Sequence, residues 1–174
     1  MSLVQLTGIM NYLVYESDKP IVPLYAEYTF LESYIALEKL RLSNKVKTSI
    51  QISSDEDDYF IVPVIIFSFI ENAFKHGPMS SSKNAWVDIQ IKAKDGKLHM
   101  NISNGFKRVP KPVGYVGGVG LDNVKKRLDL NYAGNYRLSI QEMEDRYIVK
   151  LELNLIVTKF ENDIEDVKYN SALE

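Results

Sequence analysis

Alternation of apolar and polar residues in several short segments constrains the fold of this chain more than any other feature. Apolar side chains occupy every second position in residues 87–93 and 98–102, and the turn-forming pair Asp95-Gly96 joins these two segments. Residues 46–52, 136–140 and 147–155 alternate in the same way. A strand of this kind has one buried and one solvated face. We therefore expect a largely antiparallel sheet covered by helices on one face, a two-layer α/β sandwich of the α+β class.

Helical spacing of apolar residues predicts the elements that cover this sheet. A first amphipathic helix follows residues 6–14 and ends near Pro20, and a second begins just after Pro23. We expect the second helix to bury one apolar face and to carry charged residues around the rest. The apolar face comprises Leu24, Tyr28, Leu31, Ile35, Leu37 and Leu40, and the charged residues are Glu27, Glu32, Glu38, Lys39 and Arg41.

Two further helices are predicted in the stretches of chain between the alternating segments. Pro63 suits a first helical turn, and the apolar stretch behind it ends at Gly77, a favourable residue just past a helix end. Because that helix is apolar on nearly all sides, we expect it to be central and buried. The other helix follows a Gly- and Pro-rich loop over residues 104–118 and is marked by Leu121, Val124 and Leu128.

Composition and pattern together predict one α/β domain with a helical front section. Residues 1–43 form the two amphipathic helices, residues 44–157 the domain, and residues 158–174 a polar tail that is frayed or disordered. The net charge of −2 gives no basic field, so nucleic acid is not an expected partner. Cysteine is absent, which excludes disulfides and thiolate zinc sites. The longest apolar run is too short for a membrane span, so we expect a soluble chain.

Four polar residues lie in the last turns of the predicted central helix. Glu71, Asn72, Lys75 and His76 are related by steps of three and four, so they share one face near the end of an otherwise apolar helix. Placing polar and charged side chains at the edge of a core costs free energy unless they interact with a partner or a ligand. The structural alternative is a polar helix end, where Lys and His interact favourably with the helix dipole.

The second unusual segment is the glycine-rich stretch from Gly114 to Leu121, directly ahead of a predicted helix. Glycine permits backbone conformations that aim successive N–H groups inward, and a helix N-terminus adds positive potential, so both features suit a polyphosphate. The alternative is a flexible connection. No Gly-Lys-Ser/Thr follows, which excludes a Walker loop, and the strand–helix–strand context of a dinucleotide fingerprint is missing.

In their order along the chain, these two segments resemble the N box and the G2 box of the GHKL ATPase superfamily. The chain resembles its LytS-like branch of sensor histidine kinases over about residues 9 to 155. The segments that carry the resemblance are Tyr12-Leu13-Val14-Tyr15-Glu16-Ser17, Val22-Pro23-Leu24, Tyr34-Ile35-Ala36-Leu37-Glu38-Lys39-Leu40-Arg41, Glu71-Asn72-Ala73-Phe74-Lys75-His76-Gly77 and Gly118-Val119-Gly120-Leu121-Asp122-Asn123-Val124-Lys125-Lys126-Arg127-Leu128. The resemblance implies the Bergerat (GHKL) fold, with ATP and Mg²⁺ as ligands.

The resemblance also implies roles for individual residues of the N box. Asn72 matches the asparagine that coordinates magnesium, and an amide oxygen is a suitable hard ligand for that ion. Glu71 matches an acidic position that polarises the accepting group or a water molecule. Lys75 would pair with phosphate charge, and His76 would pack its ring near the nucleoside.

The G2 box and the adenine position complete the implied site. Gly118 and Gly120 would let the lid approach the phosphates, with the N–H groups of Val119, Gly120 and Leu121 as donors. Arg127, on the helix behind the lid, is interpreted as a structural ion-pair residue.

One position departs from the family pattern. Where the family usually has Asp-x-Gly, with the aspartate accepting a hydrogen bond from the adenine amino group, this chain has Ile102-Ser103-Asn104-Gly105. Asn104 is the best candidate for that role because an amide oxygen can also accept such a hydrogen bond. The alternative is that Asn104-Gly105 is only a turn.

The family further implies a histidine kinase whose phosphoacceptor histidine is not in this chain. His76 belongs to the N box, and alternation places His99 on the polar face of a strand. We therefore expect a fragment that transfers the γ-phosphate of Mg-ATP to a histidine elsewhere and does not autophosphorylate. The expected partners are the acceptor helix of the same kinase, a second copy of the kinase and a response regulator, and the parent protein would be a membrane sensor with this part in the cytoplasm.

Two other functions remain open at this point. The chain could be a non-catalytic nucleotide-binding or dimerisation module with a degenerate pocket, a possibility that Asn104 raises. It could also be another GHKL ATPase, such as an anti-sigma-factor kinase, although the front helices match the LytS-like pattern.

Overall fold

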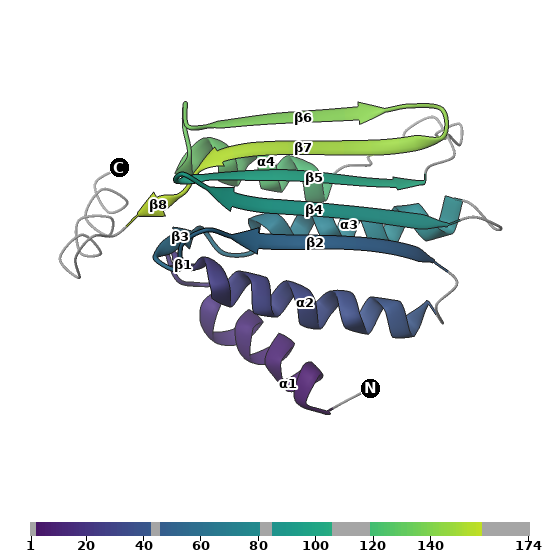
Figure 1. Ribbon diagram of the computed structural model, residues 1–174, viewed down its shortest axis with the longest axis horizontal. Helices are drawn as coiled ribbons and strands as arrows, with labels where there is room; N and C mark the ends of the chain where they lie inside the picture. The colour runs from purple at the N-terminus through teal and green to yellow at the C-terminus, as the bar shows by residue number, and fades with distance from the viewer. Residues whose placement is uncertain (1–2, 43–45, 81–84, 106–118, 158–174) are drawn as a thin grey trace.

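The computed structural model describes residues 3–42, 46–80, 85–105 and 119–157, and its centre is a five-stranded sheet (Figure 1). The strand order is β2 (Lys47–Ser54), β4 (Trp86–Lys94), β5 (Lys97–Gly105), β7 (Arg146–Asn154) and β6 (Tyr136–Glu142). All neighbouring strands are antiparallel except β2 and β4, which are parallel. The alternating segments of the sequence are therefore the strands of one largely antiparallel sheet, as predicted.

The turn between β4 and β5 has the conformation that its residues favour. Asp95 and Gly96 have φ angles of 52° and 74°, so both lie in the left-handed region required at the centre of a tight hairpin turn. The register that follows pairs Ile89 with Ile102 and Ile91 with Met100. Apolar side chains on both strands consequently face the same side of the sheet.

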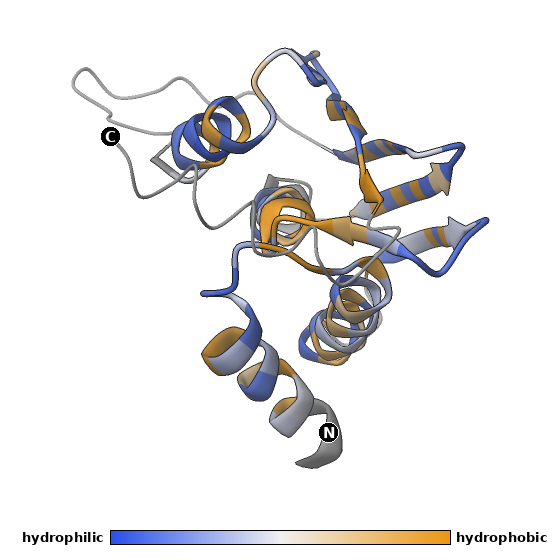
Figure 2. Cartoon of the chain, turned by 90° about the vertical axis from the view of Figure 1, so that its left-hand side faces the viewer, coloured by the Kyte–Doolittle hydropathy of each residue, from blue (hydrophilic) through white to orange (hydrophobic). Residues whose placement is uncertain are grey.

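Two helices cover that apolar side of the sheet. They are α3 (Ile65–Ser80) and α4 (Val119–Asn131), and α3 packs on β4, β5 and α4. Figure 2 shows the alternation as stripes of hydrophilic and hydrophobic residues along the strands. The architecture is the predicted two-layer sandwich, with the other side of the sheet open to solvent.

The central helix is buried as predicted, but its end differs. Ile66, Phe69, Ile70 and Phe74 are all fully buried along α3. The helix continues through Gly77 to Ser80, so Gly77 does not mark its end. The cost of one glycine in a helix is about 1 kcal/mol, and burying several large apolar side chains along α3 contributes more than that.

The front section consists of α1 (Leu3–Asn11), a π-helical turn η1 (Tyr12–Glu16) and α2 (Leu24–Arg41). Figure 1 shows α2 running beside β2, with α1 farther from the sheet. Residues of both α1 and α2 share one hydrophobic core with α3 and the sheet. Among the helices that the structure describes, none combines the length and the apolar character that crossing a membrane requires.

The buried face of α2 is rotated from the predicted one. Leu40, predicted to be buried, is 54% exposed, and Phe30 is buried instead. Glu27, predicted to lie on the charged side, is 0% exposed, and Glu38 is also buried. Apolar spacing alone misplaced this face because Glu27 has polar partners inside the protein.

A second, smaller sheet was not predicted. It pairs β3 (Tyr59–Ile61) with β1 (Val22–Pro23) on one side and β8 (Ile156–Val157) on the other. The strands are two or three residues long, too short for alternation to be recognisable. The loop predicted at 104–118 is wrong for its first two residues, which end β5, and its residues 106–118 and the predicted tail at 158–174 lie outside the described residues.

Candidate nucleotide site on α3, β5 and α4

The polar cluster of α3 stands on the side of the helix that faces away from the core. Ala73 and Phe74 are buried against the sheet side, whereas Glu71, Lys75 and His76 are exposed and Asn72 is half-buried. The apolar residues at helical spacing fix the rotation of α3, so the remaining positions point outward together. The structure thus brings the predicted N-box residues onto one accessible face.

The charge state of His76 is biased toward the neutral ring. Partial burial lowers the pKa of His76 from its usual value of 6.5, and the neighbouring Lys75 ammonium lowers it further, while Glu71 acts in the opposite direction. At neutral pH the ring is therefore uncharged. A neutral aromatic ring suits the predicted position beside a nucleoside better than an imidazolium would.

Asn104 occupies the inner, helix-covered face of β5. It follows Leu98, Met100 and Ile102 in the buried register and is only 2% exposed. Its Nδ2 donates a hydrogen bond to the Gly105 carbonyl at 3.0 Å, which leaves the side-chain oxygen as the acceptor group of the amide. Because both residues belong to strand β5, the alternative that Asn104-Gly105 is only a turn is wrong.

Gly105 is where the strand approaches a large side chain closely. A Cβ atom at this position would lie 3.1 Å from Nε1 and 3.2 Å from Cδ1 of Trp86, the first residue of the neighbouring β4. Sequence reasoning did not anticipate this contact. The chain's single tryptophan, one residue ahead of an alternating strand, was the available signal.

Of the predicted phosphate-binding segment, the structure describes only the part that forms the first turn of α4. Gly118 and the rest of the glycine-rich loop lie outside the described residues, whereas α4 begins at Val119 and includes Gly120 and Leu121. The first N–H groups of a helix have no partner within it, so they remain available to an anion. Val124 and Leu128 are buried and hold α4 beside α3.

Arg127, predicted to be a structural ion-pair residue, makes a structural contact with the main chain instead of with a charged partner among the described residues. Its Nη2 donates to the carbonyl of Pro63 at 3.0 Å, just ahead of α3. This contact joins α4 to the start of the helix that carries Asn72.

The donor set available to a cation is small. Within the described residues no group of three or more histidine, aspartate or glutamate side chains converges on a metal site. The amide oxygen of Asn72 stands half-exposed on α3. Such a set fits Mg²⁺, which is usually held by one or two protein oxygens together with waters and substrate phosphates.

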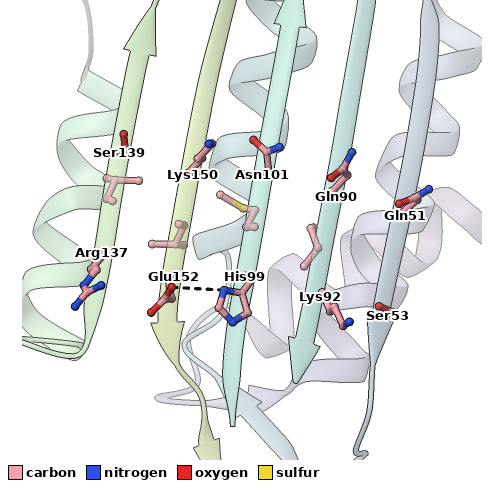
Figure 3. Close-up of a pocket in the computed structure, with 14 residues that line it drawn as sticks. Gln51, Ser53, Gln90, Lys92, His99, Asn101, Arg137, Ser139, Lys150 and Glu152 are labelled. Atoms are coloured by element: carbon pink, nitrogen blue, oxygen red, sulfur yellow. Dashed lines mark ion pairs between the residues drawn. The ribbon is translucent and has the colours of Figure 1, made fainter. Parts of the chain in front are cut away.

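A separate cavity of about 600 Å³ lies on the solvent-facing side of the sheet (Figure 3). Its lining includes Gln90, His99, Asn101 and Lys150, and it contains none of the predicted site residues. His99 is exposed there and pairs with Glu152 at 3.6 Å, so its prediction as a solvated residue is confirmed. The predicted site and this cavity are on opposite faces of the sheet.

Comparison with known proteins tests the resemblance to the LytS-like sensor histidine kinases. No protein-family model matches the chain. The chain is 24% identical over 153 residues to the sensor protein LytS of Staphylococcus epidermidis, covering 82% of this chain and 26% of that protein. It is 25% identical over 126 residues to the sensor histidine kinase BtsS of Escherichia coli, covering 72% of this chain and 22% of that protein.

The predicted resemblance to the LytS-like sensor histidine kinases is confirmed. The chain spans about a quarter of the length of these curated relatives. Solved structures agree on the fold. The catalytic domain of histidine kinase ThkA superposes with a TM-score of 0.54 at 13% identity, over 79% of this chain and 97% of that one. The histidine kinase domain of the blue-light activated kinase EL346 from Erythrobacter litoralis gives 0.57 at 16% identity, over 87% of this chain and 79% of that one.

These likenesses to solved structures establish the fold of a histidine kinase catalytic domain for this chain. The expected architecture, with helices on one face of a largely antiparallel sheet, is thereby confirmed. At such low identity the structures support the fold alone, so the roles of individual residues remain predictions.

Proposed function

We propose that this chain is the ATP-binding catalytic region of a two-component sensor histidine kinase. The observation that carries the proposal is the placement of the N-box residues on one accessible face of α3, the helix that packs on β5, where Asn104 is buried, and on α4. In this reading residues 1–43 belong to the rear of the dimerisation region, and residues 44–157 bind the nucleotide.

Each residue has a distinct task in this proposal. Asn72 holds Mg²⁺, Lys75 pairs with phosphate charge, and the N–H groups at the start of α4 take the remaining phosphate oxygens. The bound ion neutralises charge that develops on the phosphates during transfer. Glu71 polarises the accepting group, and Asn104 accepts a hydrogen bond from the adenine amino group.

The acceptor is a histidine outside this chain, on a helix of the same kinase. Phosphoryl transfer needs donor and acceptor in line at near-contact distance, and positioning supplies most of the catalysis. His99 is on the opposite face of the sheet from α3, paired with Glu152. His76 stands on the wall of the site near the proposed nucleoside position. The downstream partner is a response regulator, and the whole kinase would be a membrane-tethered homodimer with this region in the cytoplasm.

Calorimetric titration with ATP tests the binding half of the proposal. We expect binding that depends on Mg²⁺ in the parent protein, and loss of that dependence in Asn72→Ala. Gln90→Ala, which removes an amide from the solvent-facing side of the sheet, is the matched control and should behave like the parent. Equal affinity with and without Mg²⁺ in the parent would contradict the proposal.

Labelling with γ-labelled ATP tests the transfer half. The chain alone should acquire no acid-labile label, whereas a separate dimeric helical protein that carries the acceptor histidine should become labelled when the chain is added. Nucleotide binding without transfer to that protein would instead favour a non-catalytic binding module. Label on His76 or His99 would refute the assignment of an external acceptor.

A further inference from the structure

A buried carboxylate lies at the boundary between the front helices and the rest of the protein. Glu27 of α2 is fully buried, and its Oε2 accepts hydrogen bonds from the Tyr12 hydroxyl and from the Val64 amide, the latter at 3.1 Å. Burial raises the pKa of Glu27, an effect that both hydrogen bonds oppose. A buried acidic group is tolerated only where such partners are in place. None of the proposed nucleotide-binding roles uses Glu27.

The three residues ahead of α3, here called the 62–64 turn, are held by side chains of α2, of α4 and of Tyr132, the residue that follows α4. The amide of Val62 donates to Oη of Tyr132 at 2.9 Å, and the carbonyl of Pro63 accepts from Arg127 at 3.0 Å. The amide of Val64 donates to Glu27. The start of α3 is thus held by one contact from α4, one from Tyr132 just after α4, and one from α2.

Val64, the residue of the 62–64 turn that is hydrogen-bonded to Glu27, has an unfavourable backbone conformation. Val64 has a φ of 66°, in the left-handed region that β-branched residues avoid. Such a conformation persists only where the surroundings enforce it. The carbonyl of Val64 in turn accepts hydrogen bonds from the amide and hydroxyl of Ser68, within the first turn of α3. The strained residue is therefore part of the start of the helix.

Tyr12 links this arrangement to the N-terminal helices. It lies at the start of the π-helical turn η1, a geometry that is frequent at functional sites. Its ring stacks on Phe30 of α2 with centroids 4.3 Å apart, while its hydroxyl reaches Glu27. A displacement of α1 and η1 would consequently shift Glu27, and through it Val64, the last residue of the 62–64 turn that leads into α3.

We propose that Glu27 is a positioning residue, a junction through which the N-terminal helices set the placement of α3 and of the nucleotide residues on it. This inference rests on the proposed ATP-binding function. From Val64 to Asn72 the helix rises about 12 Å, and a helix transmits a displacement of one end to the other because its backbone is rigid. The junction is built from Tyr12, Glu27 and Val64, and the same turn is held by Arg127 of α4 and by Tyr132, the residue after α4.

The variant Tyr12→Phe tests the junction, because it keeps the ring stacked on Phe30 and removes only the hydroxyl bound to Glu27. We expect amide hydrogen exchange at Val64 to become at least about tenfold faster, and the dissociation constant for Mg-ATP to rise roughly three- to tenfold. Tyr25→Phe is the matched control, since Tyr25 lies on α2 but is 63% exposed. Its exchange and affinity should equal those of the parent.

Two variants of Glu27 separate positioning from general stability. Glu27→Gln keeps the shape and an acceptor oxygen for the Val64 amide, so it should recover most of the parent's ATP affinity. Glu27→Leu removes the acceptor and should show the full loss; if this variant does not fold, Tyr12→Phe carries the test alone. Equal loss of affinity in both folded variants would overturn the positioning role.

The outcomes distinguish failure of the junction from failure of the proposed function. Unchanged exchange at Val64 in Tyr12→Phe would overturn the junction, whatever the protein binds. Faster exchange with an unchanged dissociation constant would overturn its connection to the nucleotide residues. A parent protein that binds no nucleotide would overturn the proposed function, and with it the second part of this inference.

Discussion

Removal of one hydroxyl, in Tyr132→Phe, should destabilise the protein measurably. The ring of Tyr132 is buried and would stay so, but the buried amide of Val62 would lose the acceptor that now lies 2.9 Å away. An amide left without a partner in such a place costs about 1–3 kcal/mol. For a chain of this size that corresponds to a fall in Tm of about 2–10 °C.

Urea unfolding monitored by circular dichroism, with a thermal melt beside it, measures this cost. The midpoint should fall and the slope should stay constant, because the surface exposed on unfolding is unchanged. Tyr136→Phe is the control: the Tyr136 hydroxyl also takes part in a hydrogen bond, donating to Asp129 at 2.6 Å, but at an exposed site. Its stability should stay within about 0.5 kcal/mol of the parent's. Equal midpoints for the two variants would refute the claim that the Val62 amide depends on Tyr132.

The same variant should change the stability profile at high pH. Burial raises the pKa of Tyr132 from 10.0 to about 12. The folded protein therefore keeps the phenol protonated after the unfolded chain has begun to lose its proton, so this contribution to stability is present below pH 10.0 and is lost as the pH rises toward 12. Tyr132→Phe should show a shallower decline in stability over that range than the parent.

Three further outcomes follow from single positions. Gly105→Ala should lower stability by about 1–3 kcal/mol in urea unfolding, because the new methyl group meets the Trp86 ring at 3.1 Å. In an NMR titration His76 should show a midpoint below 6.5, and its contribution to stability should be lost as the pH falls below 6.5, where the unfolded chain binds the proton first. Leu98→Ala should cost about 2–5 kcal/mol, since that side chain is fully buried, whereas Leu130→Ala, at an 83% exposed position, should cost less than about 0.5 kcal/mol.

The sequence predicted the main sheet and its helices well because their signals are local. Alternation located the long strands, and the Asp95-Gly96 pair located the tight turn between two of them. The strands of the small sheet escaped detection because two or three residues carry no period. The parallel pairing of β2 with β4 also has no local signal, since it depends on the crossover through α3.

The placement of the candidate site residues on one helix face was predictable from the sequence, and the surroundings of that helix were less so. Glu71, Asn72, Lys75 and His76 could be grouped because helical spacing places them on one face, and the structure puts them there. Glu27 was misplaced because a buried carboxylate looks like any surface glutamate in a helical pattern. Its partners, Tyr12 and Val64, are 15 and 37 residues away along the chain, and only the tertiary fold brings them together.

The open face of the sheet makes this protein convenient for spectroscopy. The chain contains no cysteine, so a cysteine introduced there would be its only thiol. Gln51 and Ser139 lie on the two edge strands of that face (Figure 3). Four strand spacings separate them, roughly 19 Å. A pair of probes at these positions would report any flattening or twisting of the sheet during nucleotide binding, from the side where neither probe can touch the proposed ligand.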